Sequence, residues 1–406
     1  MNPLTRPLPA PPQALRRGPL REGRFPSRLH DPRVAALLGI WLGLAFTTCF
    51  VTGLISHFMQ HPASWLEWPS RPVNLYRVTQ GLHVATGMAT VPLLLAKLWT
   101  VAPLFWKWPP VRTVAGALER LSIVPLIGGA LFQLSTGIAN IAQWYPFRFF
   151  FTVAHYWGAW VTMGALVIHI GAKIVIVRAN VGPGREVRAA EAIRTGTTDR
   201  ISTPEPPGDG LSRRGLFAAV AAASGVITVT TVGQTVPGLA DLDLLGPRKP
   251  DVGPQRLPVN KTAAAARVLT VARDPAYTLE VLGPRPFTLS LAALMAMPHV
   301  TSHLPITCVE GWSADGTWTG VRLRTLLDRA GIPRGRGVQV ESLEASGPYR
   351  RSEVNPSHAR DPLTLLATGL HGQELALDHG YPARLIAPNR PGVLQTKWIH
   401  RIVMLP

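Results

Sequence analysis

Four long apolar segments occupy the first half of the chain, and they constrain its fold more than any other feature. They lie at roughly 34–57, 78–105, 115–143 and 150–177, and a fifth follows at about 215–240. Each is about long enough to cross a hydrocarbon core of ~30 Å. The composition agrees, since 47% of residues are hydrophobic and only 16% are charged. Short loops join the first four, so neighbours run antiparallel and a four-helix transmembrane bundle is predicted.

Lys and Arg residues predict the orientation, because cytoplasmic loops carry an excess of them. The segments 1–33, 106–114 and 178–214 contain 16 basic residues, whereas the loops on the opposite side contain three. The amino terminus is therefore predicted to be cytoplasmic, and five crossings place residues 241–406 outside the cell membrane. Most of the net charge of +18 thus serves topology, which argues against a nucleic-acid partner.

The sequence divides into five predicted parts. These are a disordered basic cytoplasmic tail (1–33), a four-helix membrane domain (34–178), a cytoplasmic linker (179–210), a fifth transmembrane helix (211–240) and an outer domain (251–406). The fifth helix opens with SRRGLF, which resembles a twin-arginine export signal. A positive-inside flank explains the same residues, and both interpretations stay open. The export signal would imply a domain that folds and takes up its cofactor in the cytoplasm.

Three histidines lie inside the second and fourth apolar segments, where ionisable residues are costly and usually functional. His83 and His155 lie near the outer ends of the second and fourth segments, at similar predicted depth. Two imidazoles from facing helices are what a b-type haem needs. His169 follows His155 by 14 residues, which returns to nearly the same helix face about 21 Å deeper. Solute transport through these histidines is a weaker alternative, because broken helices and inverted repeats are not evident.

These segments resemble the four-helix cytochrome b subunits of the cytochrome b561 and formate dehydrogenase gamma type. The resemblance implies that His83 and His155 ligate a haem iron and that His169 ligates a second. In that family the second haem also takes a histidine from the first helix. The matching stretch here, ALLGIWLG, has none, and His30 lies just before it. One haem b or two are therefore expected.

Residues 251–406 alternate between strand-like and helical patterns. Strand patterns occupy 279–290, 338–345 and 382–388, and apolar residues of 321–332 recur at helical spacing. A mixed α+β domain is predicted. Cys308, one of two cysteines, stands before a Gly-Trp turn in this domain. It is either a buried thiol that packs as a small apolar group or a thiolate that binds a transition metal.

Two further stretches carry polar groups that suit an anionic ligand. HGYPAR (379–384) places an imidazole in a loop and a guanidinium on a strand, and QTKW (395–398) adds an ammonium. Arg and Lys that converge on one place suit a phosphorylated ligand. Exposed Arg and Lys more often form a solvated surface, so the pattern alone leaves the question open.

Residues 258–406 resemble the molybdenum domain of the sulfite oxidase family. The similarity rests on CVEGW around Cys308 and on DHGYPARLIAP followed by TKWIHRI. It implies that Cys308 coordinates molybdenum and is the catalytic centre's protein ligand. His379, Arg384 and Lys397 would hold molybdopterin and its phosphate.

The same resemblance implies further contacts around the cofactor. Gln395 and Thr396 would lie beside it near the ammonium of the QTKW stretch. Asn260 and Lys261 stand where the family has an Asn-His pair, and Glu344 stands where the animal and plant enzymes have a carboxylate.

The predicted protein is a multi-pass membrane oxidoreductase with molybdenum-molybdopterin outside the membrane and b haem within it. It would transfer an oxygen atom to or from a small oxo acceptor or donor, and exchange electrons with quinone or a redox protein. The direction of transfer is left open. The alternative is a haem b electron carrier whose outer domain is degenerate and without catalysis.

Overall fold

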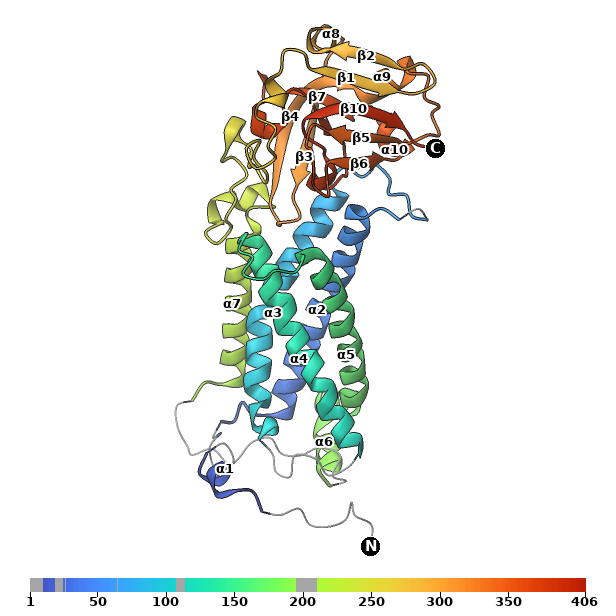
Figure 1. Ribbon diagram of the computed structural model, residues 1–406. Helices are drawn as coiled ribbons and strands as arrows, with labels where there is room; N and C mark the ends of the chain where they lie inside the picture. Colours follow the sequence, from blue (N-terminus) through green and yellow to red (C-terminus); the bar gives the residue numbers. More distant parts are fainter. Residues whose placement is uncertain (1–9, 19–24, 26, 64, 107–113, 195–209) are drawn as a thin grey trace. The chain divides into compact units, whose positions relative to one another are not determined.

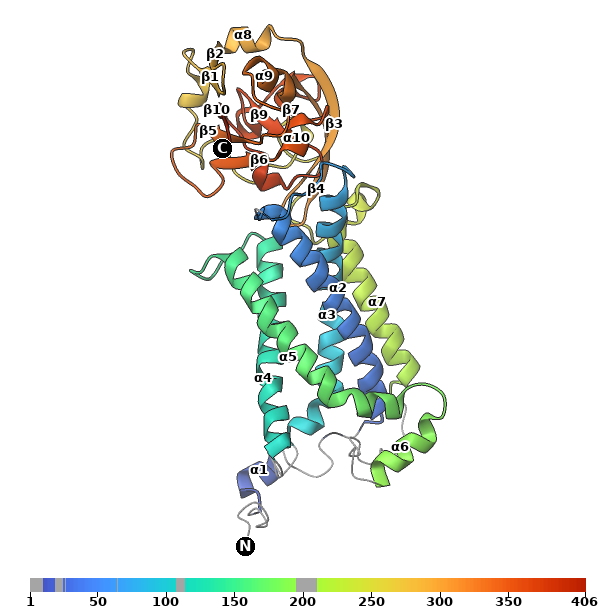
Figure 2. The ribbon, with the colours of Figure 1, turned by 90° about the vertical axis from the view of Figure 1, so that its right-hand side faces the viewer.

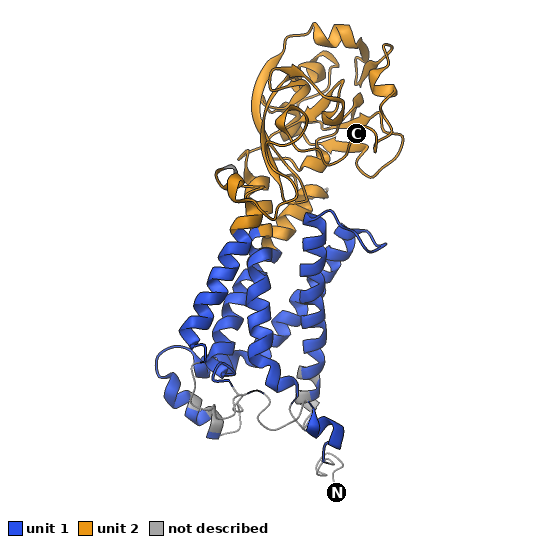
Figure 3. Cartoon of the chain, turned by 90° about the vertical axis from the view of Figure 1, so that its left-hand side faces the viewer, with its two compact units in different colours: residues 1–50, 85–228 blue, residues 51–84, 229–406 orange. Residues whose placement is uncertain are grey.

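The computed structural model describes residues 10–18, 25, 27–63, 65–106, 114–194 and 210–406. The chain forms two compact units, shown in separate colours in Figure 3. Unit 1 comprises residues 1–50 and 85–228, and unit 2 comprises 51–84 and 229–406. The division falls within three long helices, so unit 2 contains both the outer domain and one end of each of these helices.

The named elements of the described chain before residue 233 are all helices. They are α1 (Gln13–Arg17), α2 (Pro32–Gln60), α3 (Leu75–Phe105), α4 (Val114–Ile141), α5 (Phe151–Asn180), α6 (Arg185–Arg194) and α7 (Arg213–Val232). In Figures 1 and 2, α4 and α5 run side by side. Five of the described helices, α2, α3, α4, α5 and α7, are long and apolar enough to span a membrane. The five predicted apolar segments are thus helices, and the chain is a membrane protein.

The stretch predicted as a disordered tail contains residues that pack against helices. His30 is buried in unit 1, where its Nδ1 lies 3.0 Å from the carbonyl of Thr100 and its ring packs on Trp99. The predicted tail therefore contains an ordered, packed end. Asp31 caps α2 through the amides of residues 33 and 34 and pairs with Arg213 at 3.0 Å. Residues 1–9, 19–24 and 26 of the predicted tail lie outside the described part.

Helix α6 occupies part of the stretch predicted as a linker. Arg188 closes the turn before it by donating to the carbonyls of residues 178, 181 and 183. An Arg194–Glu191 pair adds a contact at i,i+3 spacing. Residues 195–209 of the linker lie outside the described part. Helix α7 ends at Val232, before the predicted end at 240, and a 3₁₀ turn (Pro237–Leu242) follows.

Unit 2 contains two five-stranded sheets. The first has the order β2-β1-β10-β5-β6, and the second has β3-β4-β7-β8 with β9 on β7. The strands are β1 (Thr278–Leu282), β2 (Phe287–Ser290), β3 (Val300–Thr307), β4 (Ser313–Arg322), β5 (Val338–Ser342), β6 (Arg351–Val354), β7 (Leu365–Leu370), β8 (Gln373–Glu374), β9 (Arg384–Ile386) and β10 (Ile399–Met404). Only β1 and β10 pair in parallel among these named strands.

Short helices fill the connections of this domain. They are α8 (Leu291–Met295), α9 (Leu323–Arg329) and α10 (Pro356–Arg360), with 3₁₀ turns at Pro254–Arg256, Val271–Arg273, Leu377–His379 and Gly392–Leu394. The predicted mixed α+β class is confirmed. The predicted helix at 321–332 begins only at Leu323, because Val321 and Arg322 still pair with β7 as the end of β4. Apolar side chains from both sheets and α9 share one core.

Candidate functional site

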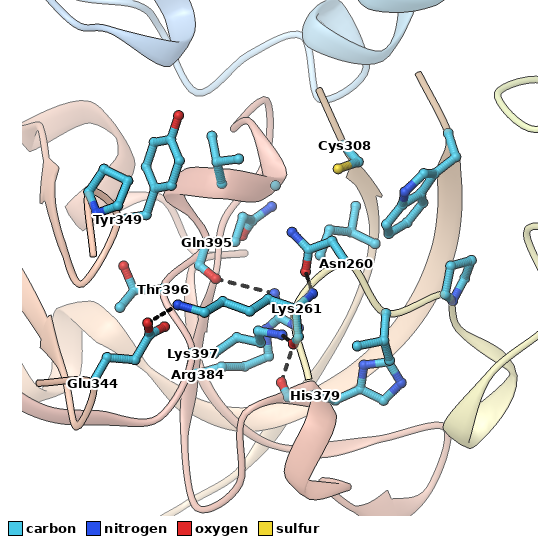
Figure 4. A pocket seen from close by; sticks show the side chains of 17 residues that line it. Asn260, Lys261, Cys308, Glu344, Tyr349, His379, Arg384, Gln395, Thr396 and Lys397 are labelled. Atoms are coloured by element: carbon cyan, nitrogen blue, oxygen red, sulfur yellow. Dashed lines mark hydrogen bonds and ion pairs between the residues drawn. The ribbon is translucent and has the colours of Figure 1, made fainter. Parts of the chain in front are cut away.

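A pocket of unit 2 brings together the nine residues of the outer domain that the sequence suggested. The pocket encloses about 720 Å³ of space, part of which is open to solvent. The nine are Asn260, Lys261, Cys308, Glu344, His379, Arg384, Gln395, Thr396 and Lys397. Figure 4 shows Cys308 on one side, with Arg384, Lys397 and His379 grouped on the other. The pocket thus has a sulfur end and a cationic end.

Cys308 lies in a tight turn between β3 and β4. Its amide donates to the carbonyl of Trp312 at 2.9 Å, and the amide of Gly311 donates back to the Cys308 carbonyl at 3.1 Å. Gly311 has a φ of 96°, a left-handed conformation that glycine adopts without steric cost. The turn is held on its other side by Gly392, where a Cβ atom would lie 2.8 Å from the Thr307 carbonyl. Backbone contacts therefore fix the position of the sulfur.

The Cys308 side chain is buried, with 2% of its surface exposed. Burial, with a smaller effect of Glu310, raises the pKa of this thiol well above its usual value. A thiol in this place stays protonated near neutral pH unless a metal ion displaces the proton. The burial agrees with both readings of Cys308, but its place at the wall of a polar pocket favours a ligand over simple packing.

Arg384 is a buried cation on β9. Its guanidinium donates to the carbonyls of His379 at 3.1 Å and Gln395 at 3.3 Å, and lies 4.9 Å from the centre of the Trp318 ring. Burial lowers the pKa of Arg384 to about 9. Within the described residues no carboxylate forms an ion pair with it. A buried charge without a counter-ion is costly, so the pocket is suited to an anion.

Lys397 brings a second cation to the same end. Its ammonium donates to the carbonyls of Lys261 at 2.5 Å and Asp378 at 2.9 Å. Burial first, and then the nearby Arg384, lower the pKa of Lys397 to about 7. An anionic group that entered the pocket would favour the charged form of this side chain. Lys397 and Arg384 together form a cradle for a phosphate-sized anion.

His379 is neutral at physiological pH. Its Nε2 lies 2.7 Å from the Pro254 carbonyl, which can only accept, so this nitrogen carries the proton and Nδ1 is an acceptor. Burial lowers the pKa of His379 to about 4. Gly380 follows with a φ of 111°, and a Cβ there would lie 3.0 Å from the Cβ atoms of both Arg384 and Lys397. The bare backbone at Gly380 therefore allows these side chains to stand together.

Gln395 and Thr396 line the pocket, but their side chains bind mainly protein. The amide of Gln395 accepts from the Ala387 amide at 2.7 Å and donates to the carbonyls of Ala387 and Arg390. The Thr396 hydroxyl lies 2.7 Å from that of Ser352. Both residues therefore shape the wall of the pocket, and their contacts with the cofactor stay a prediction.

The remaining predicted residues stand at the more exposed side. Lys261 forms an ion pair with Glu344, and its amide donates to the Asn260 side chain at 2.8 Å. Tyr349 also lines the pocket, although its sequence context gave no signal for it. Burial, with Cys308 as a second cause, raises the pKa of the Tyr349 hydroxyl. It stays protonated and is able to donate a hydrogen bond into the pocket.

These groups fit a metal that arrives with most of its own ligands. Within the described residues no three His, Cys, Asp or Glu side chains gather to hold a metal ion by themselves. One soft sulfur opposite two buried cations instead matches an anionic organic cofactor that carries the metal.

Comparison with known proteins agrees. Residues 266–406 match the model of the oxidoreductase molybdopterin binding domain. A protein-methionine-sulfoxide reductase catalytic subunit MsrP of Gluconobacter oxydans (strain 621H) is 32% identical over 48% of this chain and 70% of its own length. This chain belongs to the sulfite oxidase and MsrP family of molybdopterin oxidoreductases. The buried sulfur and cations of the pocket lie within the matched region.

Other relatives cover smaller parts of the oxidoreductase. An MsrP of Xanthomonas campestris pv. campestris is 33% identical over 35% of this chain and 49% of its own length. A putative protein-methionine-sulfoxide reductase subunit YedZ1 of Azospira oryzae is 32% identical over 28% of this chain and 40% of its own. Among solved structures, the sulfane dehydrogenase SoxCD from Paracoccus pantotrophus is similar at 25% identity. The match covers 32% of this chain and 38% of that chain, with a TM-score of 0.30.

The histidines of the membrane segments lie in both units. His83 is on α3 in unit 2, where Gly53 of α2 makes room for its ring, since a Cβ there would lie 2.8 Å from its Cε1. His155 is on α5 in unit 1, and its Nδ1 lies 3.0 Å from the Thr136 hydroxyl. That hydroxyl also donates to the carbonyl of Phe132.

This arrangement sets the tautomer of His155. Because the Thr136 hydroxyl uses its hydrogen on a carbonyl, Nδ1 of His155 carries a proton and Nε2 is left in the form that binds iron. The pairing of His83 with His155 around one haem, and a second haem at His169, stay predictions.

Proposed function

We propose that this oxidoreductase reduces sulfoxides by oxygen-atom transfer, with electrons that arrive through b haem from a quinol. The observation that carries the proposal is the single pocket that joins the Cys308 sulfur to the buried cations Arg384 and Lys397. The reductive direction is supported by the relatives, since the matched MsrP proteins and YedZ1 are named as parts of protein-methionine-sulfoxide reductases. The reverse direction, oxidation of sulfite, is the second candidate to be tested.

Each side chain of the pocket has a proposed task toward molybdopterin. Cys308 would bind molybdenum as a thiolate, since coordination removes the proton that burial otherwise retains. Arg384 and Lys397 would hold the cofactor's phosphate, and neutral His379 would accept a hydrogen bond at Nδ1. The bound molybdenum centre would supply the oxygen-atom transfer and the two-electron redox change. The protein supplies position, charge and exclusion of water.

The open side of the pocket is proposed to receive the substrate. Tyr349 is protonated there and can donate to a sulfoxide oxygen, which is a strong acceptor. The Lys261–Glu344 ion pair lies beside Lys397, at the cationic end of the pocket, and is proposed to face the cofactor rather than the substrate.

The membrane part is proposed to carry the electrons. His83 and His155 would clamp a b haem near the outer end of the helices, His169 would serve a second, and quinol would be the donor in the membrane. The amino terminus would be cytoplasmic and the outer domain extracytoplasmic, as the distribution of basic residues predicts. Two electrons and two protons would convert each sulfoxide to a thioether and water.

Metal and haem content of the purified chain test the proposal directly. We expect molybdenum and haem in the same detergent-solubilised protein, with quinol-dependent reduction of methionine sulfoxide. The variant Cys308→Ser should lose turnover and molybdenum while keeping the haem absorption spectrum. A chain with haem but without molybdenum would support the alternative, an electron carrier with a degenerate outer domain. Sulfite-dependent haem reduction without sulfoxide turnover would reverse the proposed direction.

A further inference from the structure

The outer turns of α3 contact the loop that carries the candidate molybdenum ligand. Gln80 of α3, which is 5% exposed, donates from its Nε2 to the Val309 carbonyl at 3.2 Å. Val84, one turn further along the helix, lies against Gly311, where an added Cβ would come within 2.9 Å of its Cγ2. All of these residues belong to unit 2. The loop after Cys308 thus rests directly on a membrane helix.

The opposite side of this loop is also held. The amide of Ser313 donates to the Gln234 carbonyl at 2.7 Å, and the hydroxyl of Thr235 donates to the carbonyl of Gly311. Arg77 of α3 in turn donates to the Thr235 carbonyl at 3.1 and 3.2 Å and pairs with Asp315 at 2.8 Å. The loop is therefore enclosed between α3 and the segment that follows α7.

The hairpin between α2 and α3 is anchored to the same domain further from the loop. Arg71 binds Asp361 through two nitrogens, at 3.0 and 3.2 Å. The Asn389 side chain accepts from the backbone amide of Tyr76 at 2.9 Å and donates to the Pro69 carbonyl at 2.7 Å. The backbone amide of Asn389 donates to the Val73 carbonyl. The Asp361 and Asn389 side chains that form these bonds are buried. Buried bonds of this kind are expected of a permanent contact rather than of a transient one.

The contact residue and the predicted haem ligand stand on the same helix. Gln80 and His83 are three positions apart, which is less than one turn and about 4.5 Å along the axis. Residues at this spacing share a face of the helix. A short run of covalent bonds and one hydrogen bond therefore connects the Cys308 backbone to the His83 backbone.

We propose that the outer turns of α3 are a fixed electron relay, in which Gln80 holds the Cys308 loop on the helix that presents His83. This inference rests on the proposed function and adds the path that the electrons take from the haem to the molybdenum. In each transfer one electron leaves a ferrous haem at His83, which becomes ferric, and reduces the molybdenum bound at Cys308 by one electron. A quinol re-reduces the haem, and two transfers with two protons from solvent convert one sulfoxide to thioether and water. No movement of the outer domain is needed.

The test follows haem oxidation in the full chain. Detergent-solubilised protein is reduced with a soluble quinol, mixed with methionine sulfoxide, and the haem band is recorded by stopped flow. Gln80→Leu and, separately, Val84→Ala should slow haem oxidation at least several-fold and leave the haem midpoint potential unchanged. Reduction of methionine sulfoxide by a viologen dye, which bypasses the haem, should be retained. Gln60→Leu is the matched control, because the Gln60 amide donates to the Tyr76 hydroxyl of α3 rather than to a carbonyl of the Cys308 loop.

Solvent viscosity separates a fixed relay from a moving domain. The rate of haem oxidation should stay constant as sucrose is added, and a rate that falls in proportion to viscosity would overturn the proposal. Equal haem oxidation in wild type, Gln80→Leu and Val84→Ala would overturn it as well. If wild-type protein lacks molybdenum, haem or dye-driven activity, the proposed function fails and the relay with it. If the wild-type protein contains molybdenum and haem and has dye-driven activity, but both variants oxidise haem at the wild-type rate, the relay alone is refuted.

Discussion

Lys397→Met is expected to change the pH dependence of stability in the cofactor-free protein. The pKa of Lys397 falls from 10.5 to about 7 in the folded chain, mainly through burial. Between these two pH values the unfolded chain binds about one more proton than the folded chain at this site. The free energy of unfolding of the wild type should therefore rise with pH in this window, and the substitution should remove that rise.

The magnitude follows from the two pKa values. Each pH unit in which the protonation differs by one is worth about 1.4 kcal/mol. From about pH 7.5 to about pH 9.5, the stability of the wild type should gain roughly 2.5 kcal/mol relative to Lys397→Met. Other groups titrate in the same range, the Cys308 thiol among them, but they are present in both proteins and largely cancel in the difference.

The buried Cys308 thiol itself supplies the assay. Full-length protein is made in a host that lacks molybdopterin, with Cys49 replaced by serine, and thiol labelling is measured against urea at each pH. Rates are corrected with a short peptide of the same sequence. Arg334→Met is the control, because it removes an exposed cation of the same domain. The stability difference between wild type and Arg334→Met should be the same at both pH values. If the difference between wild type and Lys397→Met were also the same at both pH values, the lowered pKa of a buried Lys397 ammonium would be refuted.

Three further perturbations test separate parts of the molecule. Gly380→Ala should lower molybdenum retention and destabilise the outer domain by about 1–3 kcal/mol, because a Cβ at this positive φ meets the Cβ of Lys397 at 3.0 Å; molybdenum content and thiol labelling measure it. Arg71→Gln should cost about 1–3 kcal/mol, since it leaves the nearly buried Asp361 carboxylate without its ion pair; unchanged labelling in urea would contradict this. His155→Ala should abolish the haem Soret band and spare the molybdenum content, which optical spectra and metal analysis record together.

The periodic parts of the fold were predictable from the sequence. Hydropathy located the five long helices, because a lipid-facing helix needs an unbroken apolar run. The strands at 279–290 followed from their alternation and were found as β1 and β2 in antiparallel pairing. The first and last residues of α6 and α7 could not be predicted from the sequence. Arg188 caps carbonyls of the preceding turn, and this depends on a loop conformation that the composition of the linker does not specify.

The candidate site was predictable as a set of residues but not in its geometry. Motif similarity identified Cys308, Arg384 and Lys397, and the structure brings them to one pocket. The commitment of the Gln395 amide to the backbone of Ala387 could not be read from the sequence, because it depends on how the loop folds back. Tyr349 lies in a Gly-Pro-rich loop with no motif, and only the tertiary fold brings it to the site.

The boundary between the two units shows why hydropathy and packing give different divisions of this chain. Hydropathy reports which solvent a helix faces, so it assigns α3 as a whole to the membrane. Packing reports which residues hold one another, and by that measure the first turns of α3 belong with the outer domain. The side chains responsible are polar. Arg77 donates to the Thr235 carbonyl of the segment after α7 and pairs with Asp315, and Gln80 donates to the Val309 carbonyl beside Cys308. Helix α3 therefore contributes residues to both units, and the outer turns that belong to unit 2 are the ones that carry the proposed relay between His83 and the Cys308 loop.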